Sequence, residues 1–497
     1  ALYGLAQSEG ALGHQGEAAA ARAAFQRAWL GDPSWLRMER PTNPMMITGV
    51  LMLDEALSLS QFKQLVRKRF LSFPRFQQKP VDTATGAYWQ HDDDFDLDWH
   101  VRLSALPGRG GKKALERFAG QMASTPLDKT KPLWQFHLIE RYEGGSALVA
   151  RIHHSYADGI ALVQVLLSLT DMQRVPEPSA QLGRAWLKDD GKEVVRRVGA
   201  IDRYLKLGGR MLDKGREMYQ DPNLAQMLAK EGGLIGRELA NALLLSDDPP
   251  TLLRGRLGVS KRVAWAAPLD LDEVKAVGRA CDCTVNDVLM ATMAGALRDY
   301  MLERGEQLDG VTLRATVPVN LRPLEHARKL GNHFGLVFLD LPVGEANPVR
   351  RVQRVAESMQ QLKQSRQAMV VFGLLAAVGM APAALQSLAL DLFSRKATTV
   401  ATNVPGPQQP LYLAGSRVRE MMFWVPQTGS IGVGVSIMSY NHRVHFGLIG
   451  DARLIPDPDA VMRRIGAEFE KLLYLALMGD WEHPLRAADA DALLPVS

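Results

Sequence analysis

Two adjacent histidines, His153 and His154, open the heptapeptide His-His-Ser-Tyr-Ala-Asp-Gly that ends at Gly159. An imidazole is well suited to take and return a proton near neutral pH, because its ordinary pKa is about 6.5. The motif follows a predicted strand over 146–154, in which successive side chains point to opposite faces. The two histidines therefore cannot both face one cavity, so one can act as a base while the other packs or hydrogen-bonds. The same divergence disfavours a metal site made by the pair.

Asp158 lies four residues after His154 and precedes a predicted helix over 159–169. Its side chain can cap that helix. It can also pair with an arginine, for which Arg322 and Arg151 are the candidates, or accept a hydrogen bond from the histidine as in a hydrolase triad. The chain has no Gly-x-Ser-x-Gly nucleophile elbow, which disfavours a serine acyl-enzyme and favours direct transfer between two substrates.

Hydrophobic periodicity places the histidine motif at the end of a β-hairpin within an α/β pattern. In the first half, strands are expected at 45–53, 134–142 and 146–154, and helices at 59–73 and 113–122. In the second half, strands are expected at 261–266, 311–319, 335–341, 418–424, 432–440 and 443–449, and helices at 271–280, 284–304, 348–365 and 458–477. Similar make-up on both sides of a basic helical stretch predicts two α/β domains.

The length of 497 residues exceeds what one ordinary core supports. The expected division is an N-terminal helix of uncertain status over 1–30, a first domain over 31–178, a long helical linker over 179–260 and a second domain over 261–497. Hydrophobic content of 46% and charged content of 23% are typical of a folded, soluble protein. The net charge of +5 comes without a basic cluster that interleaves aromatics, so nucleic acid is not an expected partner.

The two cysteines, Cys281 and Cys283, cannot build a disulfide framework, which favours a reducing, cytoplasmic setting. No second Cys or His pair nearby completes a metal site. The sequence shows neither a signal peptide nor an uninterrupted apolar run of about eighteen residues. The apolar segment 368–390, interrupted at Pro382, is either a buried helix pair or a surface that touches membrane or a lipid droplet.

Further segments accompany the histidine motif. They are Pro132-Leu133-Trp134, Asn286-Asp287, the run from Pro318 to Pro323 that includes Arg322, Gly331-Asn332-His333, and the run Thr402-Asn403-Val404-Pro405-Gly406-Pro407. Together these segments resemble the bacterial wax ester synthase/diacylglycerol acyltransferase family, within the CoA-dependent acyltransferase superfamily. The HHxxxDG pattern alone is typical of the whole superfamily, whereas PLW, ND and NVPGP together indicate this family.

The resemblance implies two chloramphenicol-acetyltransferase-like domains, each a mixed sheet flanked by helices, with an active-site tunnel at their interface. It implies His154 as catalytic base with His153 supporting it. The residues expected to support the site structurally are Asp158, Gly159, Arg322 and Trp134. Those expected to line the substrate channel are Asn286, Asp287, Thr402, Asn403, Pro405 and Gly406. Asn286 and Thr402 are the candidates for polar groups near the thioester, although Asn286 could also cap a turn and NVPGP could form a tight turn.

The implied reaction moves a fatty acyl group from acyl-CoA, a cosubstrate, to a long-chain alcohol or to diacylglycerol, without a bound cofactor or metal. Peripheral contact with a membrane or lipid droplet is expected, and a homodimer is one assembly that the sequence leaves open. Two alternatives remain. One is a condensation domain that takes its acyl group from a carrier protein and makes an amide. The other is a non-catalytic lipid-binding protein with the same fold.

Overall fold

The structure is a computed structural model that describes residues 39–83, 86–156, 162, 165–175, 245–320, 334–364, 391–427, 429–479 and 483–493. The chain forms two compact units. The first contains Ala1–Pro178, Glu325–His333 and Pro410–Pro426, and the second contains Ser179–Leu324, Phe334–Gln409 and Gln427–Ser497. The expected N-terminal helix over 1–30, most of the expected linker over 179–260 and the apolar segment 368–390 lie outside the described residues.

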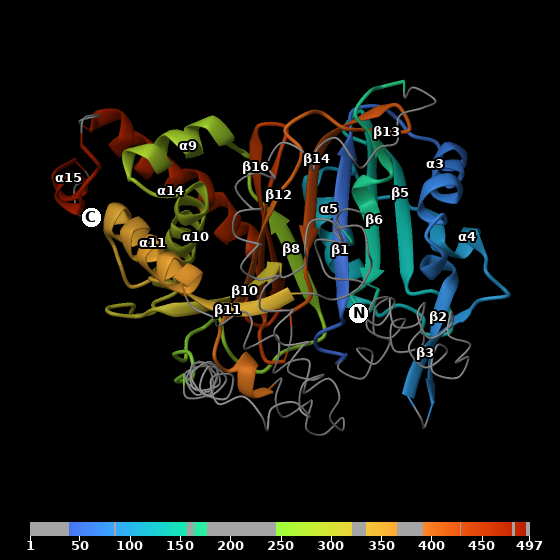
Figure 1. The fold of residues 1–497 in the computed structure, drawn as a ribbon, viewed down its shortest axis with the longest axis horizontal. Coiled ribbons are helices and arrows are strands. Elements are labelled where there is room, and N and C mark those ends of the chain that lie inside the picture. Colours follow the sequence, from blue (N-terminus) through green and yellow to red (C-terminus); the bar gives the residue numbers. More distant parts are fainter. Residues whose placement is uncertain are drawn as a thin grey trace, which may run out of the picture. The chain divides into compact units, whose positions relative to one another are not determined.

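The first unit is built on a seven-stranded sheet with the strand order β4-β5-β6-β1-β14-β13-β7. Its strands are β1 Met46–Leu53, β4 Val101–Leu103, β5 Trp134–Tyr142, β6 Gly145–His153, β7 Thr170–Asp171, β13 Tyr412–Leu413 and β14 Ser416–Trp424. Figure 1 shows β6, which leads to the histidine motif, between β5 and β1, and it pairs antiparallel with both. Every residue of β1 and β6 is buried, which is typical of inner strands with continuous apolar runs.

One part of this sheet comes from a segment that the sequence placed in the second domain. Pro410–Pro426 belongs to the first unit, because β14 pairs antiparallel with β1 from Thr48 opposite Trp424 to Leu53 opposite Val418. The expected second domain over 261–497 therefore differs from the observed division at this segment. The apolar pattern of 418–424 identifies a strand correctly, but a local pattern carries no information on which distant strand will pair with it.

The main difference from the expected helices of the first unit lies at 59–73, and the short α4 was not expected. The expected helix over 59–73 is α3 Leu59–Leu65 followed by a π-helical turn at Val66–Phe70, and a 3₁₀ turn follows at Pro74–Gln77. A capping box between Ser58 and Gln61 begins α3. The other elements are α4 Leu97–His100, α5 Lys112–Ser124 and a separate hairpin of β2 Gln78–Thr83 with β3 Gly86–His91.

The second unit contains a sheet with the strand order β11-β10-β12-β15-β16-β8, and β9 pairs with β16. Its strands are β8 Lys261–Trp265, β9 Leu269–Asp270, β10 Leu313–Asn320, β11 Phe334–Leu341, β12 Thr399–Pro405, β15 Val433–Tyr440 and β16 Arg443–Asp451. Its helices are α9 Leu271–Ala280, α10 Val285–Leu302, α11 Pro348–Gln364, α14 Pro458–Met478 and α15 Ala487–Leu493. These helices gather on one side of the sheet around α10 (Figure 1), whose side chains are buried almost all round.

The expected α/β fold class is confirmed, with two sheet-rich units flanked by helices. β12 was not predicted from the sequence, because the NVPGP run was interpreted as a turn or as channel lining. β12 is a strand that runs parallel to β15 from Thr399 to Pro405. Within the described part of the chain, no helix has both the length and the apolar character needed to cross a membrane.

Candidate functional site

Backbone hydrogen bonds to opposite neighbours hold the two histidines at the end of β6. His153 ends the strand and its N–H donates to Leu133 O at 3.0 Å, whereas His154 begins a turn and its N–H donates to Met45 O at 2.7 Å. Leu133 directly precedes β5, and Met45 directly precedes β1. Successive N–H groups therefore point to opposite sides, as they do in an extended strand. The strand begins and ends one residue earlier than predicted, but the hydrogen-bond pattern of a strand continues through His154.

The turn of the hairpin fixes which residues reach this end. Glu143 and Gly144 have φ values of 49° and 85°, the left-handed conformation that a tight hairpin turn requires. A Cβ on Gly145 would collide with the carbonyl of Leu53 on the neighbouring strand. Glycine at that position therefore lets β6 begin directly after the turn, in the register that brings His153 opposite Met46.

His153 is a neutral ring whose Nδ1 is occupied. The backbone N–H of Ser155 donates to Nδ1 at 3.1 Å, and Ser155 Oγ lies 2.8 Å from the same atom. Because Nδ1 accepts, the proton of the neutral ring is on Nε2. Burial, with a smaller effect from His154, lowers the pKa of His153 to about 3, so the ring stays uncharged near pH 7. Its Nε2 lies 3.8 Å from Glu39 Oε1, and that carboxylate pairs with Lys129 at 2.9 Å.

Tyr156, a residue that the sequence did not single out, joins the histidine motif to the Pro-Leu-Trp segment. Its buried hydroxyl accepts a hydrogen bond from Leu133 N–H at 2.9 Å and donates one to Gln78 O at 3.1 Å. Leu133 thus uses its carbonyl for His153 and its N–H for Tyr156. In the sequence, the one sign that Tyr156 matters was an aromatic residue inside a motif of polar and small residues. That sign does not identify the partners of its hydroxyl.

Trp134 anchors the start of β5. Its indole N–H donates to Phe76 O at 2.7 Å, and its ring stacks on His100 at a centroid distance of 4.4 Å. The Nδ1–H of His100 donates in turn to Trp134 O at 2.7 Å. Burial lowers the pKa of His100 to about 4, so this ring is also neutral. These contacts tie the start of β5 to the 3₁₀ turn at Pro74–Gln77 and to α4.

Arg151, a candidate partner of Asp158, is buried with other partners. Its guanidinium donates to Gln135 Oε1 at 3.0 Å and to Thr125 O, and it has no carboxylate partner among the described residues. Burial lowers its pKa to about 10, so it remains charged at neutral pH. Asp158, Gly159 and Arg322 lie outside the described residues.

In the second unit, three of the sequence motifs meet around a cavity of about 350 Å³. Asn286 comes from the first turn of α10, Pro318 from β10, Asn403 and Pro405 from β12, and Ser439 from β15. The side-chain amide of Asn403 donates to Asn286 Oδ1 at 2.8 Å. The remaining lining residues are Leu271, Val285, Leu289, Met290, Val317 and Val444. The expected channel residues Asn286, Asn403 and Pro405 are therefore neighbours in space.

Two other expected channel residues have structural partners. Asp287 forms a capping box at the start of α10, where its Oδ2 accepts from the N–H and the hydroxyl of Thr284 at 2.9 and 2.6 Å. Asn286 is therefore not the cap. The hydroxyl of Thr402 lies 3.3 Å from Ser436 Oγ, and alternation along β12 turns it to the sheet face opposite Asn403.

A close backbone contact explains why the NVPGP run has a glycine at position 406. The N–H of Gly406 donates to Ser439 O at 2.9 Å, and a Cβ at this position would collide with that same carbonyl. The glycine therefore allows the end of β12 to approach β15 closely, beside the Asn286–Asn403 pair.

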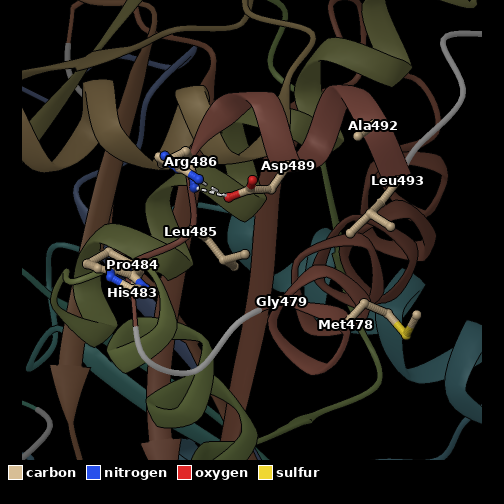
Figure 2. A pocket seen from close by; sticks show the side chains of 9 residues that line it. All are labelled: Met478, Gly479, His483, Pro484, Leu485, Arg486, Asp489, Ala492 and Leu493. Atoms are coloured by element: carbon tan, nitrogen blue, oxygen red, sulfur yellow. Dashed lines mark hydrogen bonds and ion pairs between the residues drawn. The ribbon is translucent and has the colours of Figure 1, made fainter.

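A second cavity, of about 220 Å³, lies between the end of α14 and α15 (Figure 2). Its polar pair is Arg486 and Asp489, with 3.9 Å between Nε and Oδ2, and Asp489 also accepts from Arg486 N–H at 2.7 Å at the start of α15. These groups serve the helix start and form no acid–base pair aimed into the cavity. Among the described residues, no group of three His, Cys, Asp or Glu side chains is placed to hold a metal ion.

Comparison with known proteins gives matches over most of the chain. The model of the wax ester synthase/diacylglycerol acyltransferase catalytic domain matches residues 31–289, and the model of the C-terminal domain of the same family matches residues 330–473. A Mycobacterium tuberculosis protein named as a candidate diacylglycerol O-acyltransferase is 28% identical over 467 residues, 88% of each chain. A Mycobacterium bovis protein of the same description is 27% identical over 433 residues, 85% of this chain and 89% of the relative.

Solved structures share the fold. The wax ester synthase/diacylglycerol acyltransferase from Marinobacter aquaeolei VT8 superposes with a TM-score of 0.63 at 22% identity, covering 90% of this chain and 100% of that one. The first condensation domain of the calcium-dependent antibiotic synthetase gives a TM-score of 0.55 at 15% identity, with 90% and 94% covered. At these identities the likeness shows the fold alone.

Proposed function

The chain belongs to the wax ester synthase/diacylglycerol acyltransferase family and is an acyltransferase, and on that premise we propose that it transfers a fatty acyl group from acyl-CoA to a hydroxyl oxygen with His154 as general base. The acceptor is a long-chain alcohol, which yields a wax ester, or diacylglycerol, which yields triacylglycerol. Acyl-CoA acts as a cosubstrate, and the proposal needs no bound cofactor.

The difference between the two histidines supports His154 as the base. His153 accepts from Ser155 at Nδ1, and burial lowers its pKa to about 3, so it has little capacity to take a proton near pH 7. The backbone N–H groups of His153 and His154 donate to opposite neighbours, which is the pattern of a strand, in which successive side chains diverge. In the proposed mechanism, His153 therefore stays neutral and hydrogen-bonded, and His154 transfers the proton.

The proposed reaction follows from a base beside a hydroxyl and a thioester. His154 takes the hydroxyl proton while the acceptor oxygen attacks the thioester carbonyl carbon. The tetrahedral intermediate carries its negative charge on the former carbonyl oxygen, where a hydrogen-bond donor stabilises it. The carbon–sulfur bond then breaks, and the leaving thiolate takes the proton from His154, which restores the neutral ring and releases CoA as a thiol.

Asn286 and Thr402 remain the candidate donors near the thioester, with backbone N–H groups as a further source. The structure adds one constraint to this proposal. Asn286 lies on α10 and is hydrogen-bonded to Asn403, so the side chain of Asn403 lies on the face of the second sheet that α10 covers. Alternation along β12 places the side chain of Thr402 on the opposite face. A single thioester carbonyl can therefore contact one of these two side chains and not both.

Matched asparagine substitutions test the base. We expect His154→Asn to lower kcat for ester formation by about 100- to 10,000-fold, the usual contribution of a general base. His153→Asn, which leaves the base in place, should retain more activity. Equal activity of His154→Asn and the wild-type protein would refute the base assignment. Competition between hexadecanol and dipalmitoylglycerol for labelled palmitoyl-CoA then identifies the preferred acceptor.

The likeness to condensation domains gives a second candidate function, transfer of a carrier-bound acyl group to an amine. Hexadecylamine offered beside hexadecanol separates the two, because amide formation without ester formation would favour the condensation reaction. Lipid acceptors are met at membranes and lipid inclusions, so the proposal includes peripheral contact with such a surface in the cytoplasm. Co-sedimentation with lipid vesicles tests that contact.

A further inference from the structure

The cavity beside Asn286 has a deep apolar wall and a polar mouth. Four of its lining residues are buried and carry no polar side-chain atom: Leu271, Leu289, Met290 and Val444. The polar lining residues, Asn286, Asn403 and Ser439, are all more exposed than these four. A ligand that fits this arrangement has an aliphatic part that goes in first and an oxygen-bearing end that stays at the opening.

The mouth offers hydrogen-bond capacity toward such an oxygen. Ser439 Oγ accepts from Gln408 Nε2 at 3.1 Å and from Gly406 N–H at 3.4 Å. Among the described residues no acceptor takes the hydroxyl proton of Ser439, which is therefore available for a ligand oxygen. The amide of Asn286 accepts from Asn403 through its oxygen, which leaves its NH₂ group, near Met359 Sδ at 3.9 Å, as a second donor.

We propose that this cavity is an aliphatic-chain subsite, in which the chain packs against Leu289 and Met290 and the thioester, ester or hydroxyl oxygen lies at Ser439 and Asn286. The proposal rests on the proposed function, because it assigns one substrate chain of that reaction to the cavity. Two substrates carry such a chain, namely the acyl-CoA and the lipid acceptor. The chemistry that the cavity recognises is the same for both.

Met290 and Met293 provide a matched pair for the test. Both lie on α10 and both are buried in the same core, but only Met290 lines the cavity. Met290→Phe fills the cavity and Met290→Ala enlarges it, while the same changes at Met293 disturb the core without touching it. Ratios of kcat/KM are measured for palmitoyl-CoA against octanoyl-CoA with one alcohol, and for hexadecanol against octanol with one acyl-CoA.

One of these two arms should respond, and the responding arm identifies which chain occupies the cavity. We expect Met290→Phe to lower the long-to-short ratio at least about tenfold, since even one methylene in an apolar pocket changes discrimination by about that factor. Met290→Ala should shift the ratio the other way in the same arm. The Met293 variants should keep the wild-type ratio, which is unaffected by the amount of folded protein.

Unchanged ratios in both arms for both Met290 variants would overturn the subsite, as would equal shifts in the Met293 variants. Failure of the wild-type protein to form any ester would instead count against the proposed function. Binding of a fluorescent fatty acid then still tests the cavity, because Met290→Phe should weaken that binding relative to Met293→Phe. Equal binding by the two variants would overturn the proposal without reference to activity.

Discussion

The substitution Tyr156→Phe probes the tie between the histidine motif and the Pro-Leu-Trp segment. It removes one oxygen atom and keeps the ring, which packs against Phe76 and Trp89 at centroid distances of 4.9 and 4.8 Å. Leu133 N–H then loses the acceptor that lies 2.9 Å away, and it has no other acceptor among the described residues. Leaving one buried N–H unpaired costs about 1–3 kcal/mol. We therefore expect the first unit to lose about 2 kcal/mol of unfolding free energy, a fall in Tm of roughly 4–8 °C for a unit of this size.

The same substitution should lower catalysis. Leu133 also holds His153 through its carbonyl at 3.0 Å, so release of its N–H loosens the end of β6 from which His154 projects. Misplacement of a catalytic group by about 1 Å can cost on the order of 100-fold in rate. We expect kcat for palmitoyl-CoA and hexadecanol to fall about tenfold or more, with little change in KM because no substrate contact is lost.

The control is Tyr142→Phe, the same change to a buried tyrosine at the opposite end of the β5–β6 hairpin. Steady-state kinetics and thermal unfolding are measured on both variants. If Tyr156→Phe unfolds earlier but keeps the wild-type kcat, its hydroxyl stabilises the unit without positioning His154. If its Tm also equals that of the wild type, the hydrogen bond to Leu133 is not formed in solution.

Three further outcomes are expected. Gly295→Ala should destabilise the second unit by about 3 kcal/mol in a urea titration, because a Cβ there would collide with the buried Arg351–Glu468 ion pair. Helix propensity alone predicts that alanine stabilises the helix by about 1 kcal/mol, so a stabilised variant would contradict this packing. Gly406→Ala should cost about 1–3 kcal/mol and weaken fatty-acid binding, since the new Cβ pushes β12 away from Ser439 O; full binding would contradict this. Acid should destabilise the first unit before the second in pH-dependent thermal unfolding monitored by hydrogen exchange. Burial lowers the pKa of several histidines below the unfolded value of 6.5, so the stability that their neutral rings contribute above pH 6.5 is lost as the pH falls toward 4. At pH 5 each ring lowers the free energy of unfolding by on the order of 2 kcal/mol. These rings are His100, His137 and His153 in the first unit and His445 in the second; simultaneous loss of both units would contradict this order.

Local patterns were sufficient for the elements that deliver the histidines. The hairpin of β5 and β6 was predicted from two apolar runs around Glu143-Gly144-Gly145, and its observed bounds differ from the expected ones by a residue. The helices α9, α10, α11 and α14 of the second half were found in the same way, because their apolar residues recur with helical spacing, whereas the short α15 was not predicted. These features depend on residues that are close in the sequence.

Features that depend on distant residues were not predicted. The hydrogen bond of Tyr156 with Leu133 spans 23 positions, and that of Asn403 with Asn286 spans 117. β12 was missed because Pro405 and Gly406 are typical of turns, while its strand pairing depends on β15, more than thirty residues later. The placement of β14 in the first sheet has the same origin, since its partner β1 lies at the other end of the chain.

The divergence of the two histidines was predicted for a reason that needed refinement. Strand alternation was applied through His154, although β6 ends at His153 and the next residues form a turn. The backbone supports this prediction, because its hydrogen bonds continue the strand pattern for one more residue, with His153 held by the segment before β5 and His154 by the segment before β1. A turn that began one residue earlier would release the His154 N–H from Met45 and remove the basis for the divergence. The distinction between the neutral, hydrogen-bonded ring of His153 and the proposed base His154 therefore depends on the three strands together, because β6 is a central strand with a neighbour on each side.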